Sequence, residues 1–332
     1  MSTYLFLALI VVVIVGGIIG VEALRRLNAR QSAASPNPYP ASAAERARAP
    51  FPRQLPDASG RVVTIKARPA RIVSQTLSTD EILLAICARE RIKGFSALAL
   101  DPKYSNVISE ARSTDATPLE NAEQILQVEP DLIFVASYSR PEVVEQLQSA
   151  GATVFRFANF IRIEDIRQNI RTVGYAIGED ERAEALVAQM DGELNEIRAR
   201  VPKDGPAAPR VLSYSADGYT AGSGTLFDDI IRTAGAINVA AERGFEGFPK
   251  VSAEQVAEWQ PDFIVAGADA GRFEETRQRL LADPAIATTR AARANHIIII
   301  DNRYFLTVSQ YVVRTVGALV DGLYAGQPGK AQ

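Results

Sequence analysis

The stretch AEQILQVEPDLIFVAS, residues 122–137, has a close copy further along the chain, AEQVAEWQPDFIVAGA at residues 253–268. The two align without a gap, so that Glu123 matches Glu254 and Asp131 matches Asp262. Each copy predicts an amphipathic helix, a Pro-Asp turn that ends it, and an apolar strand buried on both faces. The separation of the copies is far longer than a solenoid repeat and predicts two similar α/β lobes.

Strand and helix patterns alternate through the rest of the body, which predicts mostly parallel sheets covered by helices on both faces. Residues 179–201 lie between the two copies and carry apolar residues at helical spacing. The expected buried stripe consists of Ala185, Leu186, Met190, Leu194 and Ile197. Because a helix of this size is about 30 Å long, we interpret it as a rigid connection between the lobes. The predicted fold class is α/β, with an N-terminal lobe at residues 55–160, a bridging helical segment at 161–202 and a C-terminal lobe at 203–332.

The N-terminal segment differs from the rest of the chain. Residues 4–20 contain no charged side chain, and this run is close to the lower length limit for a membrane-spanning helix. We expect residues 1–24 to be either an uncleaved membrane anchor or a signal segment with Ala23 at its small-residue cleavage site. Arg25, Arg26 and Arg30 follow the apolar run and no basic residue precedes it, which favours a body in the cytoplasm. Residues 25–54 are rich in proline, alanine and serine and predict an extended linker.

Composition excludes several functions. The chain of 332 residues has a net charge of −3, which argues against a nucleic-acid partner, because such proteins present a basic surface to phosphates. The single cysteine, Cys87, excludes an internal disulfide, and we expect it to be buried. The single histidine, His296, begins an apolar strand and is expected to be structural. We therefore expect no metal site and no resident cofactor, because transition metals prefer several histidine or cysteine ligands. No nucleophile motif or phosphate-binding loop indicates an enzyme.

Four blocks of the body resemble one family. They are LPDASGRVVTIKARPARIVSQTLSTDEIL, AEQILQVEPDLIFVA, GSGTLFDDIIRTAGAINVA and FPKVSAEQVAEWQPDFIV. In their order they resemble the substrate-binding proteins of ABC importers that handle iron–siderophore complexes, haem and cobalamin. The resemblance implies two Rossmann-like lobes joined by one long helix, with a ligand cleft between them. It also implies a periplasmic or other extracytoplasmic location, with the N-terminal segment as an anchor in the inner membrane.

The resemblance further implies how the protein meets its partners. Family members dock on a permease through one acidic residue on each lobe, at the start of the repeated helices, and these residues are Glu123 and Glu254 here. Two exposed carboxylates on separate lobes suit arginine pockets on a symmetric permease dimer. The expected partners are an ABC permease with its ATPase subunits, and a metal-chelate small molecule.

Ligands of doubly wound sheets bind beyond the carboxyl ends of the strands, and the predicted loops there carry aromatic and arginine side chains. The candidate ligand-binding residues are Tyr104, Tyr138, Arg140, Arg162, Tyr219, Arg243, Phe248, Arg303 and Tyr304. Arginine suits the oxygens of an anionic iron chelate, and aromatic rings suit the walls of a site for a large ligand. Phe248 falls where cobalamin-binding relatives place an aromatic wall, whereas Asp101 stands where a second aromatic residue is expected. Tyr104 or Tyr138 could serve as an axial ligand to haem.

We therefore expect a non-enzymatic protein that captures an iron–siderophore-type chelate between its lobes and delivers it to a permease. Cobalamin or haem binding by the same architecture is the nearest rival hypothesis. A chelatase-like α/β enzyme is a rival from a different functional class. A cytoplasm-facing scaffold is a further hypothesis, which the arginines after the apolar run would suit.

Overall fold

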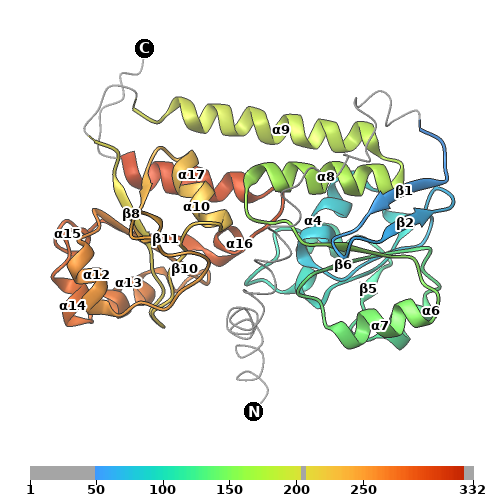
Figure 1. Ribbon diagram of the computed structural model, residues 1–332, viewed down its shortest axis with the longest axis horizontal. Helices are drawn as coiled ribbons and strands as arrows, with labels where there is room; N and C mark the ends of the chain where they lie inside the picture. The colour runs from blue at the N-terminus through green and yellow to red at the C-terminus, as the bar shows by residue number, and fades with distance from the viewer. Residues whose placement is uncertain (1–48, 203–206, 325–332) are drawn as a thin grey trace.

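The computed structural model of the chain describes residues 49–202 and 207–324. The expected membrane segment at residues 1–24 and most of the linker lie outside the described residues. Within the described ranges, no helix combines the length and the apolar character that crossing a membrane requires. Two helix-covered sheets lie side by side beneath one long helix, α9 (Asp180–Ala199), which runs along the top of both (Figure 1).

The N-terminal lobe is built on a five-stranded parallel sheet. Its strands, in spatial order, are β5 (Thr117–Pro118), β4 (Ile92–Phe95), β3 (Ile72–Ser74), β6 (Leu132–Ala136) and β7 (Val154–Phe157). Its helices are α4 (Leu77–Ile86), α5 (Ile108–Arg112), α6 (Ala122–Gln127) and α7 (Pro141–Ser149), with 3-10 helices η1 (Arg89–Arg91) and η2 (Ala97–Leu100). A separate antiparallel hairpin joins β1 (Arg53–Pro56) to β2 (Val62–Ile65). Every residue of β6 is buried, which explains its apolar sequence.

The C-terminal lobe repeats this architecture on a four-stranded parallel sheet. Its strands, in spatial order, are β11 (Ile297–Asp301), β10 (Phe263–Ala268), β8 (Arg210–Ser213) and β9 (Ile237–Asn238). Its helices are α10 (Leu226–Thr233), α11 (Val239–Glu242), α12 (Ala253–Trp259), α13 (Phe273–Leu281), α14 (Pro284–Ala287), α15 (Arg290–Arg293), α16 (Asn302–Phe305) and α17 (Val312–Tyr324). The predicted α/β fold with two similar lobes is confirmed.

The repeated sequence forms the same helix–turn–strand unit in both lobes, α6 with β6 and α12 with β10. In each unit the aspartate holds the start of the neighbouring strand. Asp131 accepts a hydrogen bond from the backbone N–H of Arg71 at 3.0 Å, and Asp262 accepts one from that of Arg210, also at 3.0 Å. The side chains of Arg71 and Arg210 donate to carbonyls at the ends of α6 and α12. In both lobes the repeated sequence therefore forms the same hydrogen bonds, which hold the end of a helix against the sheet.

Helix α9 runs along both lobes, and the helix before it packs against α9 and against α4 of the N-terminal lobe (Figure 1). α8 (Ile163–Ile177) turns into α9 at Gly178, whose φ of 72° lies in the left-handed region that glycine tolerates. The buried face of α9 includes Ala183 and Val187, whereas Ala185 is exposed. The predicted stripe is wrong at Ala185, because α9 packs against α8 as well as against the lobes.

The largest hydrophobic core is shared by the two lobes. It joins Ile82 of α4 to Val187 and Leu194 of α9 and to Val316 of α17. Two further clusters lie within the separate lobes, one around Ile264 and one around Ile133. Because one core runs through the bridge, we expect hinge motion between the lobes to be limited.

Candidate functional site

The candidate site lies at the carboxyl ends of the strands. Each sheet has one point at which the strand order reverses, between β3 and β6 in the first lobe and between β8 and β10 in the second. Ligands of open α/β sheets bind outside the carboxyl ends at such a point. Each of the nine predicted ligand-binding residues lies on a segment that leaves the carboxyl end of a strand.

Tyr138 occupies the reversal point of the N-terminal lobe. Its side chain is 46% exposed, and its ring lies 5.9 Å from that of Phe160, centroid to centroid. Its hydroxyl is hydrogen-bonded to Thr76, the N-cap of α4. Burial of this hydroxyl raises the pKa of Tyr138 to about 12, and the nearby Asp80 adds to the rise against the lowering effect of the Thr76 bond. Without a ligand Tyr138 is therefore a neutral phenol at neutral pH, which suits an aromatic wall.

A second group forms where the two lobes meet. The side-chain amide of Asn106 donates to the carbonyl oxygen of Arg303 at 3.0 Å, and the Nζ of Lys103 lies 3.5 Å from Asp269. These contacts bring the loop that carries Tyr104 against the turn that carries Arg303 and Tyr304. Burial, together with Asp269 and Asp101, raises the pKa of Tyr104.

Three of the predicted arginines are engaged by their own chain. Arg303 donates two hydrogen bonds to Asp301, at 3.0 and 2.7 Å. Arg162 lies 3.5 Å from Asp165, and Arg140 donates to the carbonyl oxygen of Glu120. Burial alone would raise the pKa of Asp301, but the hydrogen bonds and charge of Arg303 lower it below its ordinary value. The charges of Arg303 and Arg162 are therefore compensated by carboxylates of the same chain.

The three remaining candidates, Tyr219, Arg243 and Phe248, lie on the C-terminal lobe. The Nζ of Lys250 lies 5.8 Å from the centroid of the Tyr219 ring. The side chain of Phe248 is 56% exposed. The loop that holds Phe248 is braced by close backbone contact at Gly222, where a Cβ would lie 2.2 Å from the carbonyl oxygen of Phe245. None of the three makes a hydrogen bond or ion pair to the N-terminal lobe among the described residues.

Sequence reasoning missed three apolar residues at the same edge. Phe160 and Ile161 follow β7, and Leu306 follows α16. Ile161 is 43% exposed and Leu306 is 49% exposed. The available signal was their position, because each is a large apolar residue in a loop just after a predicted strand.

His296 and Cys87 were expected to be structural, and the structure shows their surroundings. His296 stacks on Phe263 with ring centroids 4.3 Å apart, at the end of β11 remote from the candidate site. Cys87 is buried. In the part of the chain that the structure describes, no three histidine, cysteine or acidic side chains are grouped so that they could hold a metal ion.

Glu123 and Glu254 occupy equivalent places on the two lobes. Both are exposed in the first turns of α6 and α12, whose N-caps are Asn121 and Ser252. A hydrogen bond from Ser252, with one from the backbone, lowers the pKa of Glu254. Because both helices begin on the carboxyl side of their sheets, the two carboxylates lie on the same side of the molecule as the candidate ligand-binding residues.

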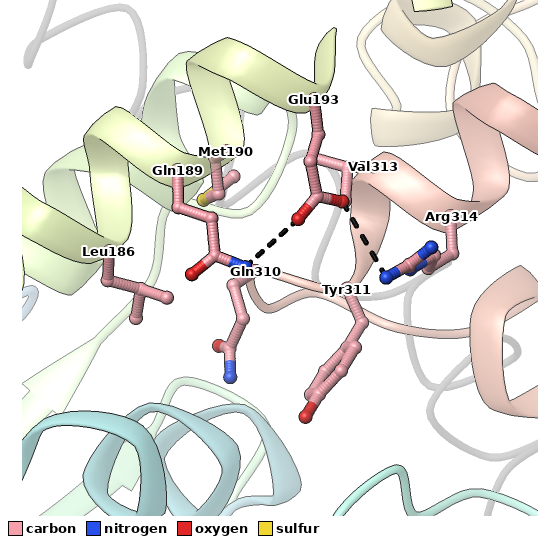
Figure 2. A pocket seen from close by; sticks show the side chains of 8 residues that line it. All are labelled: Leu186, Gln189, Met190, Glu193, Gln310, Tyr311, Val313 and Arg314. Atoms are coloured by element: carbon pink, nitrogen blue, oxygen red, sulfur yellow. Dashed lines mark hydrogen bonds and ion pairs between the residues drawn. The ribbon is translucent and has the colours of Figure 1, made fainter.

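A small pocket between α9 and the start of α17 is a separate feature. Figure 2 shows Gln189 and Glu193 of α9 on one side of it, with Arg314 facing Glu193 from α17. Its volume of about 60 Å³ has room for a few water molecules. Sites for drug-sized ligands are several times larger, so this pocket is not the chelate site.

Comparison with known proteins points to one family. The family model described as periplasmic binding protein matches residues 72–304. A cobalamin-binding protein of Halobacterium salinarum is 27% identical over 304 residues, covering 90% of this chain and 81% of the relative. An uncharacterized ABC transporter substrate-binding lipoprotein of Bacillus subtilis, YvrC, is 27% identical over 65% of this chain and 69% of its own length. The periplasmic heme-binding protein RhuT from Roseiflexus sp. RS-1 is 28% identical with a TM-score of 0.65, covering 77% of this chain and 98% of that one.

Proposed function

Because this chain belongs to the periplasmic binding protein family, we propose that it is the substrate-binding component of an ABC importer. It binds a bulky metal chelate at the carboxyl ends of its two sheets and passes it to a permease served by ATPase subunits. It carries its ligand and catalyses no reaction. The observation that supports this role most strongly is the position of all nine candidate residues on segments that leave the carboxyl ends of strands.

Within this class of ligand, the geometry favours a corrinoid such as cobalamin. The site offers exposed rings at Tyr138 and Phe248, whereas Arg303 and Arg162 are paired with carboxylates of the same chain. Asp101 stands where a second aromatic residue was expected, and the rings of Tyr138 and Phe160 supply an aromatic wall in its place. Cobalamin fits, because it presents a large neutral surface and brings its own axial ligands. A relative named for cobalamin binding spans most of the chain.

An anionic ferric siderophore is the second candidate. The guanidinium of Arg243 has no hydrogen-bond or ion-pair partner among residues 49–202 and 207–324, so it is available to a ligand carboxylate or catecholate. Haem is the third candidate, for which Tyr104 or Tyr138 would supply the axial ligand.

The location follows from the same proposal. The body lies outside the cytoplasm, and residues 1–24 tether it to the inner membrane. The arginines that follow the apolar run are the one sequence feature that favours the opposite orientation.

Calorimetric titration of the full-length chain with cyanocobalamin, haemin and ferric enterobactin tests the ligand assignment. We expect cyanocobalamin to bind most tightly. The double variant Tyr138→Ala with Phe248→Ala should weaken it by at least about 100-fold, since each buried apolar side chain contributes about 1.5–3 kcal/mol and about 1.4 kcal/mol is a factor of ten in affinity. Tyr138→Phe and the distant Val62→Ala serve as controls and should bind as the native chain does. Tight binding of ferric enterobactin alone, lost on Arg243→Ala, would replace the corrinoid by the siderophore. Calorimetry is preferable to tryptophan fluorescence, because the single tryptophan, Trp259, is buried against Phe245.

A further inference from the structure

Glu81 is a buried carboxylate at the contact between the two lobes. It lies on α4 of the N-terminal lobe and is 1% exposed. Its Oε1 accepts from the backbone N–H and the side-chain amide of Asn106, at 3.1 and 2.9 Å. Its Oε2 accepts from the hydroxyls of Ser309 and, at 3.4 Å, Thr307, which lie between α16 and α17 of the C-terminal lobe. Among the residues that the structure describes, no lysine or arginine forms an ion pair with it.

Further hydrogen bonds cross between the lobes at the same place. The hydroxyl of Ser78 donates to the carbonyl oxygen of Val308 at 2.8 Å, and the amide of Gln310 donates to the backbone carbonyl of Glu81 at 2.9 Å. Figure 2 shows Gln310 and Tyr311 pointing away from α9 at the start of α17. We call this set the Glu81 junction; its members are Ser78, Glu81, Asn106, Thr307, Ser309 and Gln310.

The Glu81 junction also positions the candidate ligand site. Asn106 ends the loop that carries Tyr104, and its amide is shared between Glu81 and the carbonyl of Arg303. Thr307 and Ser309 follow the turn that carries Tyr304 and Leu306. One carboxyl group therefore fixes the spacing of two walls that belong to different lobes.

We propose that Glu81 is a positioning residue that sets the spacing of the lobes according to its protonation. The junction is closed when the carboxyl carries a proton, and it opens to admit water when the carboxyl ionises. Both forms have partners in the closed junction, because serine and threonine hydroxyls either donate or accept. Only the ionised form gains from hydration, since a buried carboxylate without a cation is costly.

The electrostatics of the junction give the sign of this effect. Burial raises the pKa of Glu81 to about 7, against the lowering effect of its hydrogen bonds to Ser309 and Asn106. Asp80 on the same helix and Tyr311 on the opposite segment interact with its charge, while Arg303 is turned to Asp301. A hydrated Glu81 has the ordinary value of 4.5. The closed junction therefore binds the proton more tightly, is fully favoured below about pH 4.5, and loses that preference as the pH rises through about 7.

Asp80 offers a matched control on the neighbouring position. It is also fully buried, and burial raises its pKa to about 8. Its partners, Ser96 and Ser74, belong to its own lobe. Asp80 therefore shares the burial and the raised pKa of Glu81 without the bonds across the junction.

The experiment measures the distance between the lobes in the full-length, ligand-free chain. Spin labels are attached at Gln127→Cys on α6 and at Glu258→Cys on α12, with Cys87→Ala so that the native cysteine is not labelled. Pulsed electron paramagnetic resonance then gives the distance between the labels at pH 5 and pH 8.5. In the native background we expect the longer-distance population to grow with pH, by up to about tenfold per unit between pH 5 and 7. Glu81→Gln, which keeps a donor and an acceptor, should stay closed at both pH values. Asp80→Asn should respond to pH as the native chain does, and Ser309→Ala should be more open at both.

A distance distribution that is the same at pH 5 and pH 8.5 in the native background would overturn the proposal. So would a pH response that survives Glu81→Gln but is lost in Asp80→Asn. The link from lobe spacing to ligand binding rests on the proposed function, but the distances are measured without ligand. Failure of every chelate to bind would therefore refute the proposed function and leave the junction intact.

Discussion

Reversing the charge of Glu123 and Glu254 together is expected to abolish uptake while leaving ligand affinity unchanged. Both carboxylates are exposed at equivalent helix starts on the two lobes, so neither contributes to the core or to the candidate site. If each meets an arginine of the permease, Glu123→Arg with Glu254→Arg places like charges at two contacts, which costs several kcal/mol. Uptake in cells should fall by at least about 100-fold, and a single reversal should have a smaller effect.

Gln127→Arg with Glu258→Arg is the matched control for this prediction. These exposed residues lie about one turn further along the same two helices, and they match each other in the aligned copies. They add the same kind of charge to the same surface, so uptake should be nearly normal. An equal loss of uptake in the control pair would assign the effect to the general charge of this face. A loss of ligand affinity in the Glu123 and Glu254 variant would move these residues into the binding site.

Replacing Asp180 by alanine is expected to destabilise the whole body by about 3–5 kcal/mol. Asp180 begins α9, and its Oδ2 lies 2.8 Å from the Nη1 of Arg53 on β1. Both side chains are buried, with exposed fractions of 3% and 4%. Arg53 also donates to the carbonyl of Tyr175 at the end of α8. Removal of the carboxylate takes away this buried, charge-assisted hydrogen bond of Arg53, so chemical denaturation should show a lower free energy of unfolding.

Two further variants make this prediction specific. Asp180→Leu with Arg53→Met removes both charges and should recover much of the stability, because an apolar pair of similar size avoids the cost of burying ions. Asp321→Ala breaks the exposed ion pair with Arg200 at the other end of α9, and it should change stability by no more than about 1 kcal/mol. If Asp180→Ala and Asp321→Ala lowered the free energy of unfolding equally, the buried Asp180–Arg53 pair would contribute no more stability than the exposed pair.

The sequence predicted the parts of the fold that depend on local pattern. The copies at residues 122–137 and 253–268 identified the unit that both lobes share, because a helix period, a Pro-Asp turn and a continuous apolar strand are all local signals. The stripe on α9 was predicted less well. Ala185 is exposed because the helix packs against α8 on one side and the lobes on another, and that arrangement is a property of the tertiary structure.

In the candidate site, too, the features set by local sequence pattern could be predicted and those set by tertiary contacts could not. Strand ends located the loops, so Tyr138 and Arg303 could be placed at the carboxyl edges of their sheets. The pairing of Arg303 with Asp301 depends on how α16 turns away from β11, and the role of Glu81 depends on contact with Ser309, more than 200 positions away. Neither contact can be recognised in a single sequence. The Arg303–Asp301 pair changes the expected ligand, and the Glu81–Ser309 contact changes how the spacing of the lobes is expected to respond to pH.

The central claim is that one chelate is held by both lobes at once, and hydrogen exchange tests it most directly. With cyanocobalamin bound to the full-length chain, backbone amides should gain protection together at residues 137–142 and 159–162 of the first lobe and at residues 303–309 of the second. Protection confined to one lobe, or to the α9–α17 pocket of Figure 2, would contradict the account.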